Sequence, residues 1–378
     1  MKALDFDGLV LRAQELSASD IHIQTGSAPH FRIHGDVVPA GARKISTNTI
    51  DELRSLILEE GAEEQIASLG SVDHSYTVHK RNMVACRLRV SFSKCREGHK
   101  VACRLIPVNV PTIEELGLPE IFKHIADQRA GMVILAGVTG AGKSTTLAAM
   151  IERINQQRRA HIVTIEDPVE FMHTPKKSIF TRREIGADVP TFADGLRTAL
   201  RQDPDVILVG EMRDLESIRH GLVAAETGHL VFATVHSETV NDIPERIIST
   251  FPQGEQEQVR YQIADVGLAF IAQQLVKMKS GQGRQAAFEI LVLNGAARNL
   301  IRTKKSHQHD SVMQTQVRTG CTTMTRDLIQ LHQAGLIDQS SLIACAPNKE
   351  RARKYAMEHV HLDTAEPLFF SDDYAEEY

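Results

Sequence analysis

The sequence predicts an α/β protein of two domains, in which a mixed α and β segment precedes a domain built on a parallel sheet. Four short apolar runs, MVILAG, HIVTIE, VILVGE and LVFATVH, show no alternation of apolar and polar residues, and longer amphipathic segments separate them. Such runs are typical of strands buried on both faces, as in a parallel sheet covered by helices. The length of 378 residues also exceeds the size, about 250 to 300 residues, at which one hydrophobic core stops growing.

The opening segment predicts one helix and a half-solvated sheet. Apolar residues recur at helical spacing from Asp5 to Leu16. Strand-like segments follow at residues 21–24, 31–33, 76–78, 83–92 and 100–106. Several of them alternate apolar with basic residues, which is typical of an antiparallel sheet with one face in solvent. Three prolines between Pro107 and Pro119 indicate a linker out of this sheet.

These patterns give the expected domain boundaries. The N-terminal domain covers residues 1–107, the linker 108–119 and the second domain 120–365. From Glu255 onward the pattern predicts mainly helix. The acidic and aromatic end, 366–378, is expected to be a flexible tail.

Composition excludes several classes of protein. A net charge of −5 gives no overall basic footprint for wrapping a polyanion, so nucleic acid is not expected as a partner. Five cysteines without a CxxC pair favour neither a disulfide framework nor a zinc module, and they fit a reducing cytoplasm. The N-terminus lacks a signal-peptide pattern, and no apolar stretch reaches the roughly 18 residues of a membrane span.

The segment GVTGAGKS, residues 137–144, matches the phosphate-loop pattern G-x-x-x-x-G-K-[ST]. It follows a strand-like run and opens a helical segment, which is the context that this motif requires. Lys143 is expected to reach the β and γ phosphates, and the Ser144 hydroxyl to bind Mg²⁺, so the pattern predicts Mg-ATP as substrate. The residues expected to hold the nucleotide are Gly137, Thr139, Gly140, Ala141, Gly142, Lys143, Ser144 and Thr145.

Carboxylates and histidines mark the ends of the predicted strands, where catalytic groups lie in open α/β sheets. Glu166 ends HIVTIE, Glu211 ends VILVGE and His236 ends LVFATVH, while His229 precedes that last run. By position alone, either glutamate can organise Mg²⁺ or the attacking water. A histidine near a buried strand is more often a hydrogen-bonded core residue than a catalytic one.

Together these segments resemble the secretion ATPase superfamily, and most closely its PilT-like pilus retraction ATPases. The resemblance is carried by GVTGAGKSTTLAAM, TIEDPVEF, LRQDPDVILVGEMRD and AAETGHLVFATVHS, in the order and approximate spacing of the family. It begins at SASDIHIQTG and extends to about Ile343. The set is far more specific than the phosphate loop alone.

The resemblance implies a smaller PAS-like α+β domain followed by a RecA-like P-loop ATPase domain with a helical C-terminal part. Six copies are implied to form a ring with ATP at the subunit boundaries. In the family, Glu166 corresponds to the catalytic base, Glu211 to the Walker B residue that contacts Mg²⁺, and His229 to the His box. Arginines of the N-terminal sheet are implied to reach a neighbour's nucleotide, and the matching candidates are Arg87, Arg89 and Arg104.

The implied function is Mg-ATP hydrolysis that drives type IV pilus retraction, as in twitching motility, at the cytoplasmic face of the inner membrane. An inner-membrane platform protein and paralogous pilus ATPases are the implied partners. The alternatives are an assembly or secretion ATPase, an accessory retraction paralogue and, more distantly, a nucleic-acid translocase. A C-terminal signature that the family associates with retraction reads AARNLI here, residues 296–301. We expect its Arg298 and Leu300 to serve the motor's output rather than hydrolysis; the alternative is that Leu300 and Ile301 are ordinary residues of a helix core.

Overall fold

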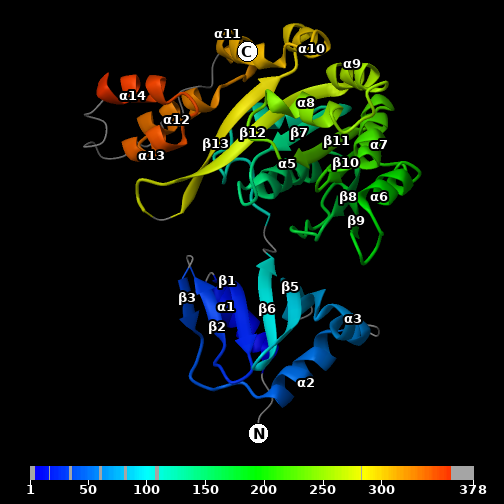
Figure 1. The fold of residues 1–378 in the computed structure, drawn as a ribbon, viewed down its shortest axis with the longest axis vertical. Coiled ribbons are helices and arrows are strands. Elements are labelled where there is room, and N and C mark those ends of the chain that lie inside the picture. The colour runs from blue at the N-terminus through cyan, green and yellow to red at the C-terminus, as the bar shows by residue number, and fades with distance from the viewer. Residues whose placement is uncertain are drawn as a thin grey trace. The chain divides into compact units, whose positions relative to one another are not determined.

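The computed structural model divides the chain into two compact units, which are described separately (Figure 1). The described residues are 5–16, 18–33, 36–58, 62–80, 83–106, 110–281 and 283–358. The first unit runs up to Val110 and includes Glu170–His173, and the second contains the rest of the described chain. Within these residues, none of the helices combines the length and apolar composition needed to cross a membrane.

The first unit is an antiparallel sheet of six strands in the order β3-β2-β1-β6-β5-β4. Its elements are α1 (Phe6–Glu15), β1 (Ala18–Gln24), β2 (His30–Ile33), β3 (Asp36–Pro39), α2 (Thr47–Ile57), α3 (Ala62–Leu69), β4 (Ser71–Lys80), β5 (Met83–Cys95) and β6 (Gly98–Ile106). Along β5, Leu88 and Val90 are buried in the core while Arg87 and Arg89 face the other way. The predicted half-solvated sheet is therefore confirmed.

The second unit is built on a sheet of seven strands in the order β13-β12-β7-β11-β10-β8-β9. The strands are β7 (Gly131–Ala136), β8 (His161–Glu166), β9 (Ile179–Glu184), β10 (Val206–Val209), β11 (Leu230–Val235), β12 (Gly267–Lys277) and β13 (Arg284–Val292). All neighbours are parallel except β13, which runs antiparallel to β12 at the edge. The four apolar runs of the sequence are the four central strands β7, β11, β10 and β8.

Helices cover both faces of this sheet. They are α4 (Ile121–Ala126), α5 (Lys143–Gln157), α6 (Phe192–Ala199), α7 (Leu215–Glu226), α8 (Asp242–Ile248), α9 (Gln256–Val266), α10 (Gly295–Arg302), α11 (His309–Thr315), α12 (Met324–Gln333), α13 (Gln339–Cys345) and α14 (Lys349–Glu358). In β7, Met132 and Ile134 join a core with α6, α7 and α9, whereas Val133 and Leu135 join the core with α4 and α5. Burial on both sides explains why the strand shows no alternation.

The expectation of a mainly helical chain after Glu255 was wrong in one respect. The long strands β12 and β13 lie in that region and extend the sheet beyond β7. The sequence GLAFIAQQLVK of β12 is apolar around its middle without a period of two, so its pattern does not distinguish a buried strand from a buried helix. The predicted tail at residues 366–378 lies outside the described residues.

Candidate active site

The phosphate loop connects β7 to α5 and depends on its glycines. Gly137 has a φ of 147°, and a Cβ added there would lie 2.4 Å from the carbonyl oxygen of Gln273 on β12. Gly142, with a φ of 86°, precedes the helix in the left-handed region. A side chain at either position would strain the backbone or clash. The loop is therefore packed directly against the neighbouring strand.

The start of α5 is open to an anion. Its first residues have no side-chain cap, whereas α6 and α7 are capped by Thr191 and Asp214. Lys143 folds back over the loop, and its Nζ donates to the carbonyl oxygens of Gly137 at 2.7 Å and Val138 at 3.2 Å. Uncapped N–H groups, the positive end of the helix dipole and this ammonium fit a bound phosphate. All eight residues predicted to hold nucleotide lie in this loop or the first turn of α5.

Sequence reasoning missed Gln273, which lies behind the loop. Its buried Oε1 accepts a hydrogen bond from the Thr146 hydroxyl of α5 at 2.9 Å. A Cβ added to Gly142 would have the Gln273 side chain as its nearest neighbour. No signal in the sequence identified Gln273, because its strand was not predicted.

The two predicted carboxylates come together at the carboxyl end of the sheet. Glu166 is the last residue of β8, and Glu211 follows the neighbouring strand β10 after one glycine. Gly210 donates its N–H to the carbonyl of Ile165 at 2.8 Å, and a Cβ on Gly210 would lie 3.3 Å from the Cα of Glu166. The missing side chain thus lets the two strand ends approach closely. Glu166 is buried, with a relative exposure of 9%.

Glu211 is held by two cationic or polar partners. His236, at the end of β11, places its Nε2 2.9 Å from Oε1 of Glu211, and Arg213 forms an ion pair with the same oxygen. This hydrogen bond raises the pKa of Arg213. The three side chains line one cavity of about 370 Å³ together with Arg246. His236 was considered as a strand-end residue but not assigned to the site, and Arg213 was missed.

His229 lies on the opposite side of the sheet, where the parallel strands have their amino ends. It precedes β11, its backbone carbonyl accepts from the N–H of Gly131 at the start of β7, and its Nδ1 lies 2.8 Å from the carbonyl of Ala224. All parallel strands have their amino ends on one side of the sheet and their carboxyl ends on the other. The length of β11 therefore separates His229 from Glu211 by about 20 Å. One chain does not bring His229 to the carboxylates, and its catalytic role stays a prediction that requires a neighbouring subunit.

The candidate arginines lie in the first unit. Arg89 pairs with Asp73 at 2.9 Å and Arg104 with Asp20 at 3.2 Å, and the two arginines are directly opposite each other on β5 and β6. Both are partly exposed, with side-chain exposures of 40% and 71%. Arg87 donates to the sulfur of Met172 at 3.2 Å. Their approach to nucleotide stays a prediction.

A magnesium ion at Ser144 and Glu211 is compatible with the donor set. A hydroxyl and a carboxylate are ligands that Mg²⁺ prefers. Within the part of the chain that the structure describes, no group of three or more His, Cys, Asp or Glu side chains is arranged to hold a metal ion.

Arg298 of the C-terminal signature has contacts within the second unit, and its expected part in the motor's output stays a prediction. Its guanidinium donates to the carbonyls of Leu293 at 2.9 Å, Ala264 at 2.7 Å and Gly267 at 2.9 Å, and also to that of Asp265. These carbonyls include the end of α9, so Arg298 caps a helix. Leu300 packs against the core. Both side chains therefore have a structural role.

Comparisons with known proteins identify the family to which the chain belongs. Residues 4–344 match the family model described as type II/IV secretion system protein. A twitching motility protein of Neisseria gonorrhoeae is 42% identical over 85% of this chain and 85% of its own length. A type IV pilus retraction ATPase, PilT, of Pseudomonas aeruginosa is 39% identical over 89% of this chain and 97% of its own. A crystal structure of the pilus retraction motor PilT with bound ADP superposes with a TM-score of 0.85 at 38% identity, covering 94% of this chain and all of that one.

Proposed function

Because the chain belongs to the type II/IV secretion system protein family, we propose that it is an ATP-driven motor that retracts type IV pili. The chain is a P-loop ATPase with a RecA-like domain after a smaller PAS-like domain. The observation that carries the proposal is that an open phosphate loop and two carboxylates all lie at the carboxyl ends of the parallel strands. This arrangement occurs in a chain that matches retraction ATPases along nearly their whole length.

The residues at these strand ends divide the work of ATP hydrolysis. The loop, Lys143 and the start of α5 bind the phosphates and stabilise the charge that develops on them. Buried Glu166 accepts a proton from the attacking water, and burial keeps other water away from it. His236 and Arg213 hold the Glu211 carboxylate through the same oxygen. When bound, Mg²⁺ neutralises charge on the β and γ phosphates.

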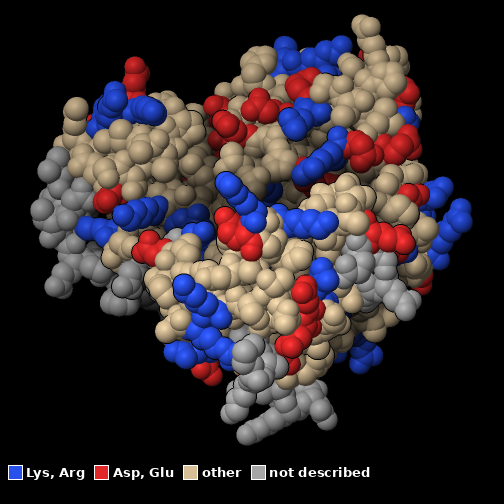
Figure 2. Space-filling model, turned by 60° about the horizontal axis from the view of Figure 1, so that its bottom comes forward, with Lys and Arg blue, Asp and Glu red and all other residues tan. Residues whose placement is uncertain are grey.

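We further propose a ring of six subunits in which arginine from a neighbouring N-terminal sheet completes the site. Arg89 and Arg104 each pair with only one carboxylate and stay partly exposed. Such arginines can exchange their carboxylate for a nucleotide phosphate of a neighbouring subunit, as arginine fingers in trans do. Support for a mechanical rather than a nucleic-acid motor comes from the surface, because Figure 2 shows basic and acidic side chains interspersed over the face in view.

In this proposal the motor works at the cytoplasmic face of the inner membrane on a platform protein, alongside paralogous pilus ATPases. The experiment is complementation of a retraction-deficient strain. Wild-type chain should restore twitching, whereas Glu166→Gln should leave cells with extended pili. Cells that instead lose all surface pili would indicate an assembly ATPase. Failure of the wild-type chain to restore twitching would refute the proposal, whereas twitching by the Glu166→Gln strain would refute only the assignment of Glu166 as the base.

A further inference from the structure

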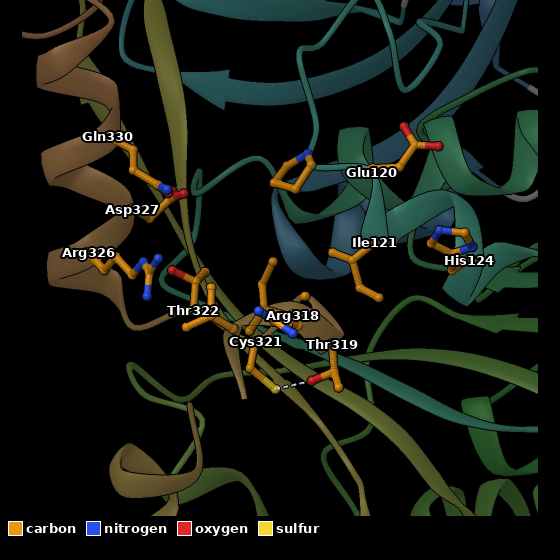
Figure 3. A pocket seen from close by; sticks show the side chains of 14 residues that line it. Glu120, Ile121, His124, Arg318, Thr319, Cys321, Thr322, Arg326, Asp327 and Gln330 are labelled. Atoms are coloured by element: carbon orange, nitrogen blue, oxygen red, sulfur yellow. Dashed lines mark hydrogen bonds between the residues drawn. The ribbon is translucent and has the colours of Figure 1, made fainter. Parts of the chain in front are cut away.

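A second cavity lies away from the phosphate loop, between α4 and α12 (Figure 3). Its volume is about 540 Å³, within the range of small-molecule sites. One wall comes from the start of α4, the opposite wall from α12, and the turn at residues 317–322 closes it below. None of its lining residues belongs to the loop or to the cavity around Glu211.

A glycine gives this cavity its shape. Gly320 has a φ of 84°, and a Cβ added there would lie 2.6 Å from Cγ1 of Ile121 on α4. The turn can approach α4 so closely only because position 320 carries no side chain. The same turn brings Arg318 to the cavity, opposite Arg326 in the first turn of α12.

The two arginines have no partner within the described residues. Some arginines of this unit are paired, such as Arg153 with Asp127 at 2.7 Å. Neither Arg318 nor Arg326 has an ion pair or hydrogen bond, although Arg326 is half-buried. Two unpaired guanidinium groups on one cavity favour an anionic ligand, because the planar group matches phosphate oxygens in pairs.

The carboxylates of the cavity do not neutralise these arginines. Glu120 is paired with Lys123 at 2.9 Å. Asp327 is only 8% exposed, and its Oδ2 accepts the backbone N–H of Phe288 at 2.8 Å. Burial raises the pKa of Asp327 to about 6, whereas a paired arginine would lower it. Asp327 therefore has acceptor capacity left for a ligand N–H group.

An apolar part of the wall comes from Ile121, Ile290 and Val317, and the other side chains that line the cavity include the polar groups of His124, Thr319, Thr322 and Gln330. The cavity thus combines an anion-binding end, an apolar wall and a buried hydrogen-bond acceptor. We propose that it is a second ligand site, which binds a nucleoside phosphate with its phosphate on Arg318 and Arg326 and its base on the apolar wall near Asp327. The site is separate from ATP hydrolysis, so the proposal stands or falls independently of the proposed function.

The test is equilibrium dialysis of full-length Lys143→Ala protein, in which the phosphate loop is disabled, with AMP, GMP, adenosine and inorganic phosphate as probes. At least one nucleotide should saturate one site per chain. The double variant Arg318→Glu and Arg326→Glu, made in the same background, should weaken that binding at least tenfold. The matched control reverses the charges of Arg129 and Arg201, two exposed arginines elsewhere in this unit, and should leave the affinity within twofold. Thermal melting checks that each variant is folded.

Asp327→Asn separates the two ends of the ligand. It keeps an acceptor for Phe288 but alters the group that faces the base, so it should weaken nucleotide binding and leave phosphate binding unchanged. No saturable binding of either nucleotide, or equal binding by the arginine-reversed variant, would overturn the proposal. Inorganic phosphate that displaces nucleotide at equal concentration would overturn the nucleoside part.

Discussion

The two sheets of this chain bury their residues in opposite ways. In the second unit the central strands are buried on both faces, and polar side chains occur where the strands end, as at Glu166 and Glu211. In the first unit one face of β5 is core, while the other carries Arg87 and Arg89 along the strand. A sheet covered by helices on both faces can place reactive side chains only at the ends of its strands. A sheet covered on one face can carry charged side chains across its whole open face.

This difference separates two kinds of contribution to a ring motor. Groups at a strand end are fixed to within the spacing of adjacent strands, about 4.8 Å, as catalysis requires. Charges on an open face are available to a neighbouring subunit. The comparison therefore predicts that substitutions of the strand-end carboxylates in the second unit act within one chain, and that those on the open face of the first unit act between chains.

Glu166→Gln should give the largest effect. Loss of the proton acceptor is expected to lower turnover by about 10²- to 10⁴-fold and to spare ATP binding, because the amide keeps the shape of the side chain. Phosphate release measures turnover, and Glu226→Gln on the exposed end of α7 is the matched control. Turnover within a few-fold of wild type would transfer the role of base to Glu211.

Lys143→Ala should weaken ATP binding by about 10- to 100-fold, because a charge-assisted hydrogen bond to phosphate contributes about 1.5 to 3 kcal/mol. Titration with a fluorescent nucleotide gives the affinity. Lys305→Ala, an exposed lysine elsewhere in the unit, should bind as wild type does. An unchanged affinity for Lys143→Ala would mean that the loop is not the ATP site.

The two ends of β11 each carry a histidine, so the effects of removing each histidine on turnover can be compared directly. His236→Ala removes a hydrogen bond to charged Glu211 and should lower turnover by about tenfold. His229→Ala, at the opposite end, should change turnover less at concentrations too low for ring assembly. Equal losses for both variants under those conditions would contradict the placement of the site at the carboxyl ends of the strands.

Mixing experiments test the first unit. Arg89→Ala and Glu166→Gln proteins should each be impaired alone and partly active together, because some boundaries regain an intact arginine and an intact glutamate. The same mixture with Arg104→Ala or Arg87→Ala identifies which arginine acts. Mixtures with no more activity than the separate proteins would exclude these arginines as groups that act in trans.

Arg298→Ala should give the smallest change, in stability rather than chemistry. It removes the cap of α9, and we expect a loss of about 1 to 3 kcal/mol in the free energy of unfolding. Denaturant titration measures it, with Arg302→Ala, which removes a single exposed ion pair to Asp265, as the smaller control. A variant of unchanged stability that no longer supports retraction would support the role in the motor's output that the sequence predicts for Arg298.

The sequence predicted the parts of the site that depend on local pattern. The phosphate loop has a fixed spacing, and Glu166 and Glu211 end strands whose unbroken apolar runs are distinctive. Gln273 could not be predicted, because its strand joins the sheet through a pairing with β7 that spans more than half of the second unit. Arg213 was hidden by its place in a loop. His229 precedes β11 as the sequence predicted, but a position in the sequence does not show whether it reaches a neighbour's site.

The contact between Thr146 and Gln273 has a mechanical consequence. Gln273 lies on the hairpin of β12 and β13, whose Val276 and Ala287 pack in the core of α12 and α13. The hairpin thus connects the phosphate-binding helix, through one hydrogen bond, with the C-terminal helices, through an apolar cluster. A shift of α5 by a fraction of an ångström during the nucleotide cycle would be carried to those helices as rigid-body rotation, without unfolding any element on the way.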